Sequence, residues 1–143
     1  MTESNFWVTV HRKLAPFGRL ERIENRIGAG TGDVCYCLRF TGRAPGTGWL
    51  ELKQLDGWPA RAQTPISIPT LTLDQVLWLE GWAAAGGRAW LLAKIGCDLV
   101  LADPPLVRAL YRGELVKTML IDRATVYGAG RFPVMEVLRC LTR

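Results

Sequence analysis

The chain has 143 residues, 49% of them hydrophobic and 22% charged, and its formal net charge is +5. These values are typical of one soluble globular domain that is large enough to bury a core. No run of about 18 apolar residues occurs, which argues against a membrane span, and the N-terminus has no pattern of a secretion signal. We therefore expect a single cytoplasmic domain over residues 1–143. The positive charge is compatible with a nucleic-acid partner but does not require one.

The N-terminal segment predicts a helix over residues 6–14, begun near 2–4 and ended by the proline and glycine that follow. At helical spacing, Glu3 continues the apolar stripe of this helix, so its carboxylate is a candidate for a buried role. The alternative is that Glu3 only interacts favourably with the positive end of the helix dipole.

Three strands are predicted next, over residues 19–27, 33–40 and 49–55, with a flexible hairpin loop between the last two. The glycine-rich run 28–32 resembles a dinucleotide-binding turn. Its glycine spacing differs from that motif, however, and a strand rather than a helix follows it. We interpret it as a tight turn and expect no nucleotide cofactor.

The second half of the chain predicts helices and strands in alternation. After an irregular proline-containing segment, Thr72 caps a helix that ends near residue 85. Residues 115–126 are ambiguous and are interpreted as a strand. The other predicted elements are strands 90–95 and 99–102 and helices 104–112 and 133–141. The pattern favours an α/β or α+β fold, with a small mixed β-sheet of about five strands flanked by helices.

The four cysteines lie in apolar patterns, so we expect buried thiols in a reducing compartment rather than disulfides. A second Cys or His pair at the spacing of a zinc site is missing, which argues against structural zinc. Trp58, in the proline-containing segment, is a candidate for stacking on a base. The cysteines are Cys35, Cys37, Cys97 and Cys140.

Two acids and a lysine stand out in the strands 33–40 and 49–55. Because side chains alternate along a strand, Glu51 and Lys53 point to one face and their leucine neighbours to the other. Charged groups on an otherwise apolar strand destabilise a protein unless they have binding partners or a function. Asp33 stands at the start of the preceding strand. The alternatives are that Asp33 is a turn residue and that Glu51 and Lys53 form a solvated pair.

Asp33 followed by Glu51-Leu52-Lys53, after a helix that carries Glu3, resembles the PD-(D/E)XK signature of restriction-endonuclease-like nucleases. The closer resemblance is to the phage-type VRR-Nuc branch, which is similar to archaeal Holliday-junction resolvases. Gly32 stands where the signature has proline. The resemblance covers a core of about residues 2–102 and leaves 103–143 as a helical C-terminal extension. The segments that carry it are 22–25, 30–34, 49–53, Gln75 and 87–92.

The resemblance implies a DNA endonuclease that uses Mg²⁺ or Mn²⁺ and hydrolyses phosphodiester bonds. The metal ligands would be Asp33, Glu51, the carbonyl of Leu52 and, directly or through water, Glu3. Lys53 would orient or help deprotonate the attacking water, and Gln75 would support the site or contact the substrate. Candidates for phosphate contacts are Arg22, Asn25 and Arg61, which would make binding salt-dependent.

One geometric expectation opposes this site. A symmetric hairpin across residues 41–48 would pair Glu51 with about Cys37, and Asp33 would then lie roughly 13 Å away. The site therefore requires an asymmetric loop or a bend just after Asp33.

The resolvase resemblance makes branched DNA or a Holliday junction the expected substrate. Two symmetric cuts require a homodimer, for which the C-terminal extension could supply the interface. One alternative is a catalytically silent nucleic-acid-binding or phage assembly protein with the same fold. Another is a monomeric nuclease that acts on ends or nicks.

Overall fold

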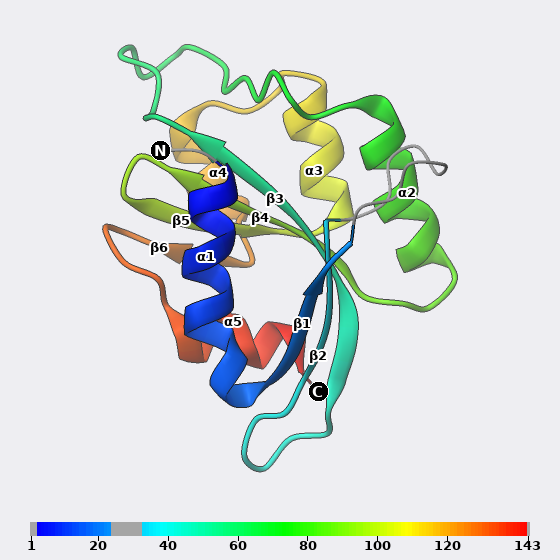
Figure 1. Cartoon of the computed structure of the whole chain (residues 1–143). Helices are drawn as coiled ribbons and strands as arrows, with labels where there is room; N and C mark the ends of the chain where they lie inside the picture. Colours follow the sequence, from blue (N-terminus) through cyan, green and yellow to red (C-terminus); the bar gives the residue numbers. More distant parts are fainter. Residues whose placement is uncertain (1–2, 24–32, 143) are drawn as a thin grey trace.

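The computed structural model describes residues 3–23 and 33–142, without the side chains of Glu3 and Ser4. Over these residues the fold is α+β, with a six-stranded mixed sheet that stays open and carries helices on both faces (Figure 1). This confirms the predicted fold class. Among the described residues no helix is both long enough and apolar enough to cross a membrane.

The elements follow one another along the chain in twelve segments. They are α1 (Glu3–Leu14), the 3₁₀ helix η1 (Ala15–Phe17), β1 (Gly18–Arg22), β2 (Val34–Leu38), β3 (Gly46–Leu55), α2 (Leu73–Ala84), β4 (Ala89–Ile95), β5 (Asp98–Ala102), α3 (Pro104–Tyr111), α4 (Lys117–Arg123), β6 (Val126–Gly128) and α5 (Val134–Leu141).

The strands lie in the sheet in chain order, from β1 at one edge to β6 at the other. The β3–β4 pair is parallel, and every other neighbouring pair is antiparallel. A parallel pair needs a crossover connection, and the segment that contains α2 supplies it. Strand β3 is the longest, with 10 residues, and joins the β1–β2 ribbon to the rest of the sheet.

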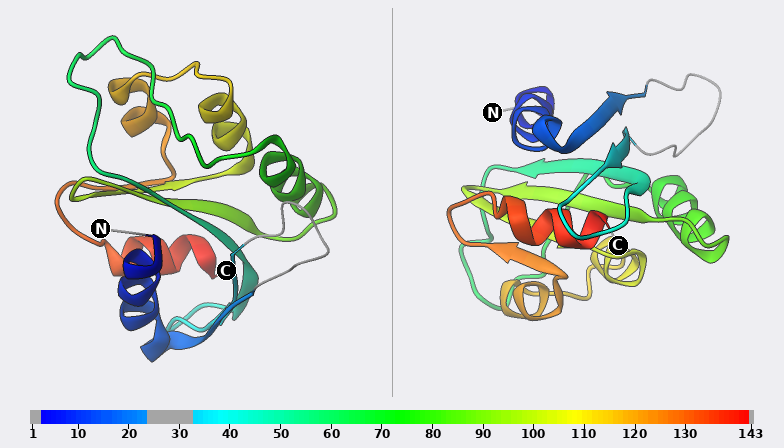
Figure 2. Two further views of the ribbon diagram at one scale, coloured as in Figure 1. Left: turned by 45° about the horizontal axis from the view of Figure 1, so that its top comes forward. Right: turned by 90° about the horizontal axis from the view of Figure 1, so that it is seen from below.

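Two apolar clusters sandwich the sheet, and alternation along β3 separates them. Leu50 and Leu52 pack with α1 and α5 on one face. On the other face, residues of β4 pack with α2, α3 and α4. Figure 2 shows α1 and α5 on one side of the sheet and the other three helices opposite. Glu51 and Lys53, which alternate with the leucines, therefore project toward the face that α2 covers.

Several predicted elements differ from the structure. Of the predicted strand 19–27, β1 ends at Arg22, and residues 24–27 and the predicted turn 28–32 lie outside the described residues. Residues 117–123 form helix α4 rather than a strand, with Leu120 buried, and a short strand β6 follows it. A short apolar segment has too few turns to show whether its period is helical or extended. Strand β3 begins at Gly46 rather than at Trp49, so part of the predicted hairpin loop belongs to the sheet.

The prediction of buried cysteines is wrong, although none of the four forms a disulfide. Cys37 and Cys97 are exposed, and Cys35 and Cys140 are half-buried. On β2, the residues that alternate with the cysteines are buried and the cysteines face away from them. A strand near the edge of a sheet can have one face packed and the other wet, so an apolar-looking sequence does not ensure burial on both faces.

Candidate active site

The register of β2 and β3 brings Asp33 beside Glu51. Val34 pairs with Leu50, so the residues just beyond this pair, Asp33 and Glu51, meet where β2 begins. The main-chain N–H of Leu52 donates a hydrogen bond of 3.0 Å to Oδ2 of Asp33. The two predicted carboxylates thus lie at one place on the sheet.

The expected pairing of Glu51 with Cys37 is wrong, because Cys37 pairs with Thr47. Strand β2 ends at Leu38 and β3 begins at Gly46, both earlier than predicted, so the hairpin loop lies closer to the N-terminus and the pairing shifts with it. A Cβ at Gly48 would lie 2.6 Å from the carbonyl oxygen of Arg88 and 2.6 Å from the hydroxyl of Tyr36. Gly48 is therefore a close-packed strand residue rather than part of a flexible loop.

The side chain of Glu51 is buried, with 1% of its surface exposed. Its Oε1 accepts a 2.8 Å hydrogen bond from Nε2 of Gln75 and lies 3.3 Å from Nζ of Lys53. Its Oε2 is buried without a hydrogen-bond partner among the described residues. Burial, followed by the charge of Asp33, raises the pKa of Glu51 to about 8. The interpretation of Glu51 and Lys53 as a solvated pair is therefore wrong.

The ammonium of Lys53 is buried with Glu51, at 3% exposure. Besides its ion pair with Glu51, its Nζ donates a 2.9 Å hydrogen bond to the carbonyl oxygen of Thr70. Two oxygen partners fix the position of a side chain that is otherwise flexible. The loop that leads into α2 thereby holds the lysine beside Glu51.

Helix α2 positions Gln75 through a capping box at its first turn. The Gln75 N–H donates to Oγ1 of Thr72 at 3.2 Å, and the Thr72 N–H donates to Oε1 of Gln75 at 3.0 Å. The amide oxygen is thus used at the helix terminus, and the amide nitrogen is directed at Glu51. The pattern Thr-x-x-Gln before an apolar run is visible in the sequence. It could have predicted that Thr72 caps α2 next to Gln75 and so belongs to the site. The carbonyl of Thr70 leaves no such signal, because every residue has one.

The donor atoms present fit a hard divalent cation. Asp33 supplies a carboxylate, and Glu51 supplies a buried carboxylate oxygen without a partner among the described residues. In an antiparallel pair the N–H and C=O of one residue point to the same side, so the Leu52 carbonyl lies on the side of β3 that faces β2 and Asp33. Mg²⁺ and Mn²⁺ take such oxygen ligands. Within the described part of the chain no group of three or more His, Cys, Asp or Glu side chains could hold a metal.

The remaining predicted residues lie apart from this group or outside the described residues. Helix α1, which begins at Glu3, packs on the sheet face opposite to the side chain of Glu51, and the Glu3 side chain is not described. Arg22 is exposed at the end of β1, beside the start of β2, and Arg61 is exposed between β3 and α2. Asn25 lies outside the described residues. The roles predicted for these four residues stay predictions.

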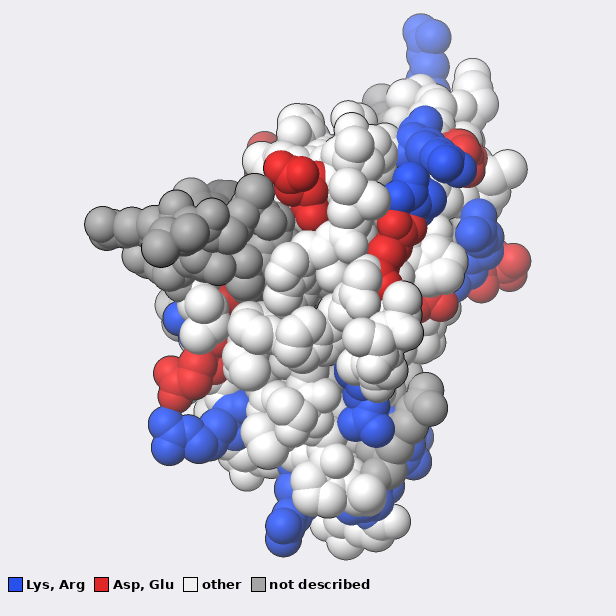
Figure 3. Space-filling view, turned by 90° about the vertical axis from the view of Figure 1, so that its right-hand side faces the viewer, with Lys and Arg blue, Asp and Glu red and all other residues white. Residues whose placement is uncertain are grey.

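The sequence did not predict a cluster of three tryptophans next to Glu51 and Gln75. Trp49 comes from β3 and Trp78 and Trp82 come from α2, with ring centroids 5.0–5.5 Å apart. Figure 3 looks onto the side of the molecule that carries α2, where a broad band without charged side chains runs down the surface. The sequence does contain a signal for this cluster: Gln75, Trp78 and Trp82 are spaced three and four residues apart, which places them on one side of a helix.

Trp58, the tryptophan predicted to stack on a base, is engaged within the protein. Its Nε1 donates a 2.7 Å hydrogen bond to Asp98, and the ammonium of Lys117 lies 5.0 Å from the centre of its ring. Its edge and one of its faces are therefore occupied. This arrangement favours a structural role for Trp58.

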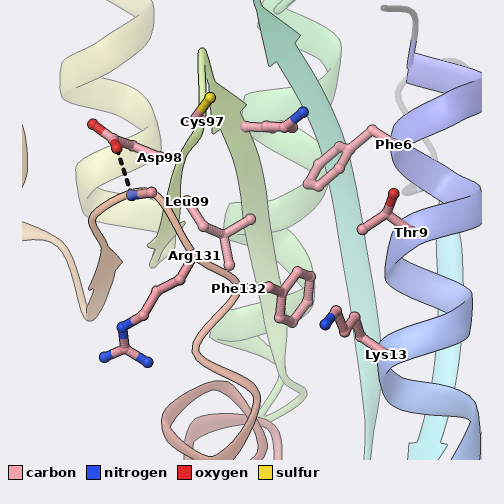
Figure 4. Close-up of a pocket in the computed structure, with 10 residues that line it drawn as sticks. Phe6, Thr9, Lys13, Cys97, Asp98, Leu99, Arg131 and Phe132 are labelled. Atoms are coloured by element: carbon pink, nitrogen blue, oxygen red, sulfur yellow. Dashed lines mark hydrogen bonds between the residues drawn. The ribbon is translucent and has the colours of Figure 1, made fainter.

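A hollow of about 440 Å³ lies between α1, the β4–β5 turn and the segment before α5 (Figure 4). Phe6 and Lys13 of α1 face Phe132 across it, and Asp98 accepts a 2.8 Å hydrogen bond from the N–H of Gly130 at its rim. The hollow opens on the α1 side of the sheet. It is therefore separate from the group around Glu51.

No protein-family model and no curated protein matches this sequence. The features that bear on function are therefore the contacts among Asp33, Glu51, Lys53 and Gln75.

Proposed function

We propose that the protein is a DNA endonuclease that requires Mg²⁺ or Mn²⁺ and resembles the VRR-Nuc branch of the PD-(D/E)XK nucleases. The observation that supports this most strongly is the burial of the Glu51 side chain, at 1% exposure, directly beside Asp33. A protein gains no stability from burying one acid next to another, because burial and like charge both oppose ionisation. Such an arrangement is understandable if the two carboxylates bind a cation during function.

Asp33, Glu51 and the carbonyl of Leu52 would hold the metal, with Glu3 as a further candidate. A divalent cation bound there would supply Lewis acidity toward the oxygens of the scissile phosphate. The protein's own contribution is to keep these oxygens fixed at the point where β2 joins β3. Arg22, Asn25 and Arg61 remain candidates for contacts with the DNA backbone.

Lys53 would act on the attacking water and on the charge of the phosphate. Its ammonium is held between Glu51 and the Thr70 carbonyl, so its position is set before substrate binds. A preorganised cation in a buried site stabilises developing negative charge more strongly than one in water. Gln75 would keep the Glu51 carboxylate in one orientation through its 2.8 Å hydrogen bond.

The rival proposal is a protein that binds DNA or assembles a virion without hydrolysis. A binding protein does not benefit from two carboxylates that would face phosphates, since like charges repel. The burial of Glu51 with Lys53 and Gln75 therefore favours the nuclease. A preference for branched DNA and the homodimer needed for paired cuts belong to the same proposal, supported by the resemblance to resolvases.

Side-by-side hydrolysis of a four-way junction and a nicked duplex tests these alternatives. We expect the wild type to cut with Mg²⁺ or Mn²⁺ and not with EDTA, and Glu51→Gln to be inactive while still folded. Preference for the junction, together with a dimer in sedimentation, would support the resolvase-like form. A folded wild type that cuts no DNA with either metal would contradict the nuclease proposal.

A further inference from the structure

The tryptophan cluster of Trp49, Trp78 and Trp82 is an aromatic wall with ordered geometry. The rings of Trp78 and Trp82 are stacked at an interplanar angle of 14°, with centroids 5.4 Å apart. Trp49 meets both rings edge-on, at 85° and 79°. Such edge-to-face and offset contacts are favourable for aromatic rings and hold them in place.

This wall is continuous with the candidate active site. Trp49 and Glu51 are two residues apart on the same face of β3, a separation of about 7 Å. Trp78 is one helical turn beyond Gln75, so their Cβ atoms are about 5–6 Å apart. Gln75 itself contacts Glu51. The tryptophans therefore lie within reach of a DNA strand whose phosphate is held at Asp33 and Glu51.

The outer part of the wall is accessible to a ligand. Trp82 is 40% exposed, whereas a tryptophan that serves only the core is largely covered. Gly87, in the turn after α2, packs against the indole, since a Cβ there would lie 2.2 Å from Nε1 of Trp82. The turn therefore fixes the pyrrole end of the Trp82 ring, and a ligand would contact the part of the ring that remains exposed. Figure 3 shows an extended patch without charged side chains on the side of the molecule that carries α2, and such a surface suits the flat apolar body of a base.

We propose that the tryptophan cluster binds an unpaired base of the DNA strand beside the scissile phosphate. The substrate class would then be DNA with unpaired nucleotides next to the cleavage site, such as a branch point, a flap or a gap. This inference rests on the proposed function, because Asp33 and Glu51 mark the path of the strand. Stacking on aromatic rings suits such a substrate because every base has an aromatic face, so no particular sequence is required.

Binding without hydrolysis tests the inference. Fluorescence anisotropy in EDTA would compare a labelled thymidine oligomer with an abasic oligomer of the same length. We expect the wild type to prefer the thymidine oligomer. Trp82→Ala should weaken thymidine binding about 5- to 100-fold and leave abasic binding unchanged. Trp82→Phe should retain most of the preference, because it keeps an aromatic ring.

Leu77→Ala is the matched control, because Leu77 is 49% exposed on the outward side of the same helix. It should bind both oligomers as the wild type does. Equal affinity of the wild type for the two oligomers, or an equal loss in Leu77→Ala, would overturn the inference. So would a Trp82→Ala variant that dissociates a dimer and keeps the base preference, since the surface would then be an interface between two copies.

The two proposals fail separately in this design. Base preference in EDTA without metal-dependent cleavage would contradict the nuclease and leave the aromatic site standing. Metal-dependent cleavage without base preference would contradict the aromatic site alone.

Discussion

Gln75 joins the N-terminus of α2 to the carboxylate of Glu51. Its amide oxygen accepts the Thr72 N–H, and its amide nitrogen donates to Oε1 of Glu51 at 2.8 Å. One side chain therefore completes a helix cap and orients a buried carboxylate. The helix and the site depend on each other through this residue.

Two substitutions separate these roles of Gln75. Thr72→Ala removes the side-chain cap and should lower the free energy of unfolding by about 1 kcal/mol with little effect on cleavage. Gln75→Ala loses both contacts, so it should be similarly destabilised and should cleave about 10-fold more slowly or worse, because Glu51 is no longer oriented. Urea unfolding and initial cleavage rates measure the two effects. Equal cleavage rates in the two variants would contradict the orienting role.

The pKa of Glu51 predicts how stability changes with pH in the metal-free protein. The folded-state pKa is raised to about 8 from an ordinary value of 4.5. Between these values the folded protein keeps a proton that the unfolded chain has released, so the free energy of unfolding falls as pH rises. The slope from this group reaches at most about 1.4 kcal/mol per pH unit.

Glu51→Gln isolates that contribution, because the amide has no proton to lose. In EDTA the variant should lose this part of the slope and should be more stable than the wild type above pH 8, the folded-state pKa of Glu51. Mg²⁺ should stabilise the wild type more above that pKa than well below it, since the cation binds the ionised carboxylate. Denaturant unfolding at several pH values measures both effects. Parallel pH profiles for the two proteins would show that Glu51 does not titrate in this range.

Removing the ammonium of Lys53 should affect cleavage and stability differently. Lys53→Met keeps an apolar stem of similar length in the buried site and leaves Glu51 without its cationic partner. We expect cleavage to fall about 100-fold or more, in the range of a lost acid–base or electrostatic contribution. Stability should change little in mild acid, where Glu51 is protonated, and should fall in alkali, where it is ionised. A variant that cleaves like the wild type would exclude Lys53 from the chemistry.

Much of the site was predictable because it depends on local alternation. The faces of Glu51 and Lys53 follow from the period of a strand, and Gln75 follows from the resemblance. The pairing of Asp33 with Glu51 was not predictable, because register depends on where the hairpin loop closes. Glycine is typical of both loops and close-packed strands, and Gly48 proved to be the second kind. Burial of the acid and lysine also depends on α2, which is distant in the sequence.

Gly48→Ala should test whether the register of β2 and β3 builds the site. The added methyl group would lie 2.6 Å from the Arg88 carbonyl oxygen, so β3 would have to shift or strain, at a cost of about 1–3 kcal/mol. The cleavage rate should fall by more than the loss of stability explains, because Asp33 and Glu51 would no longer lie side by side. Gly57→Ala is the matched control, since a methyl group added there would have nothing within 4 Å among the described residues. Thermal unfolding and cleavage rates of both variants measure the difference, and a fully active, equally stable Gly48→Ala would contradict the close packing at this position.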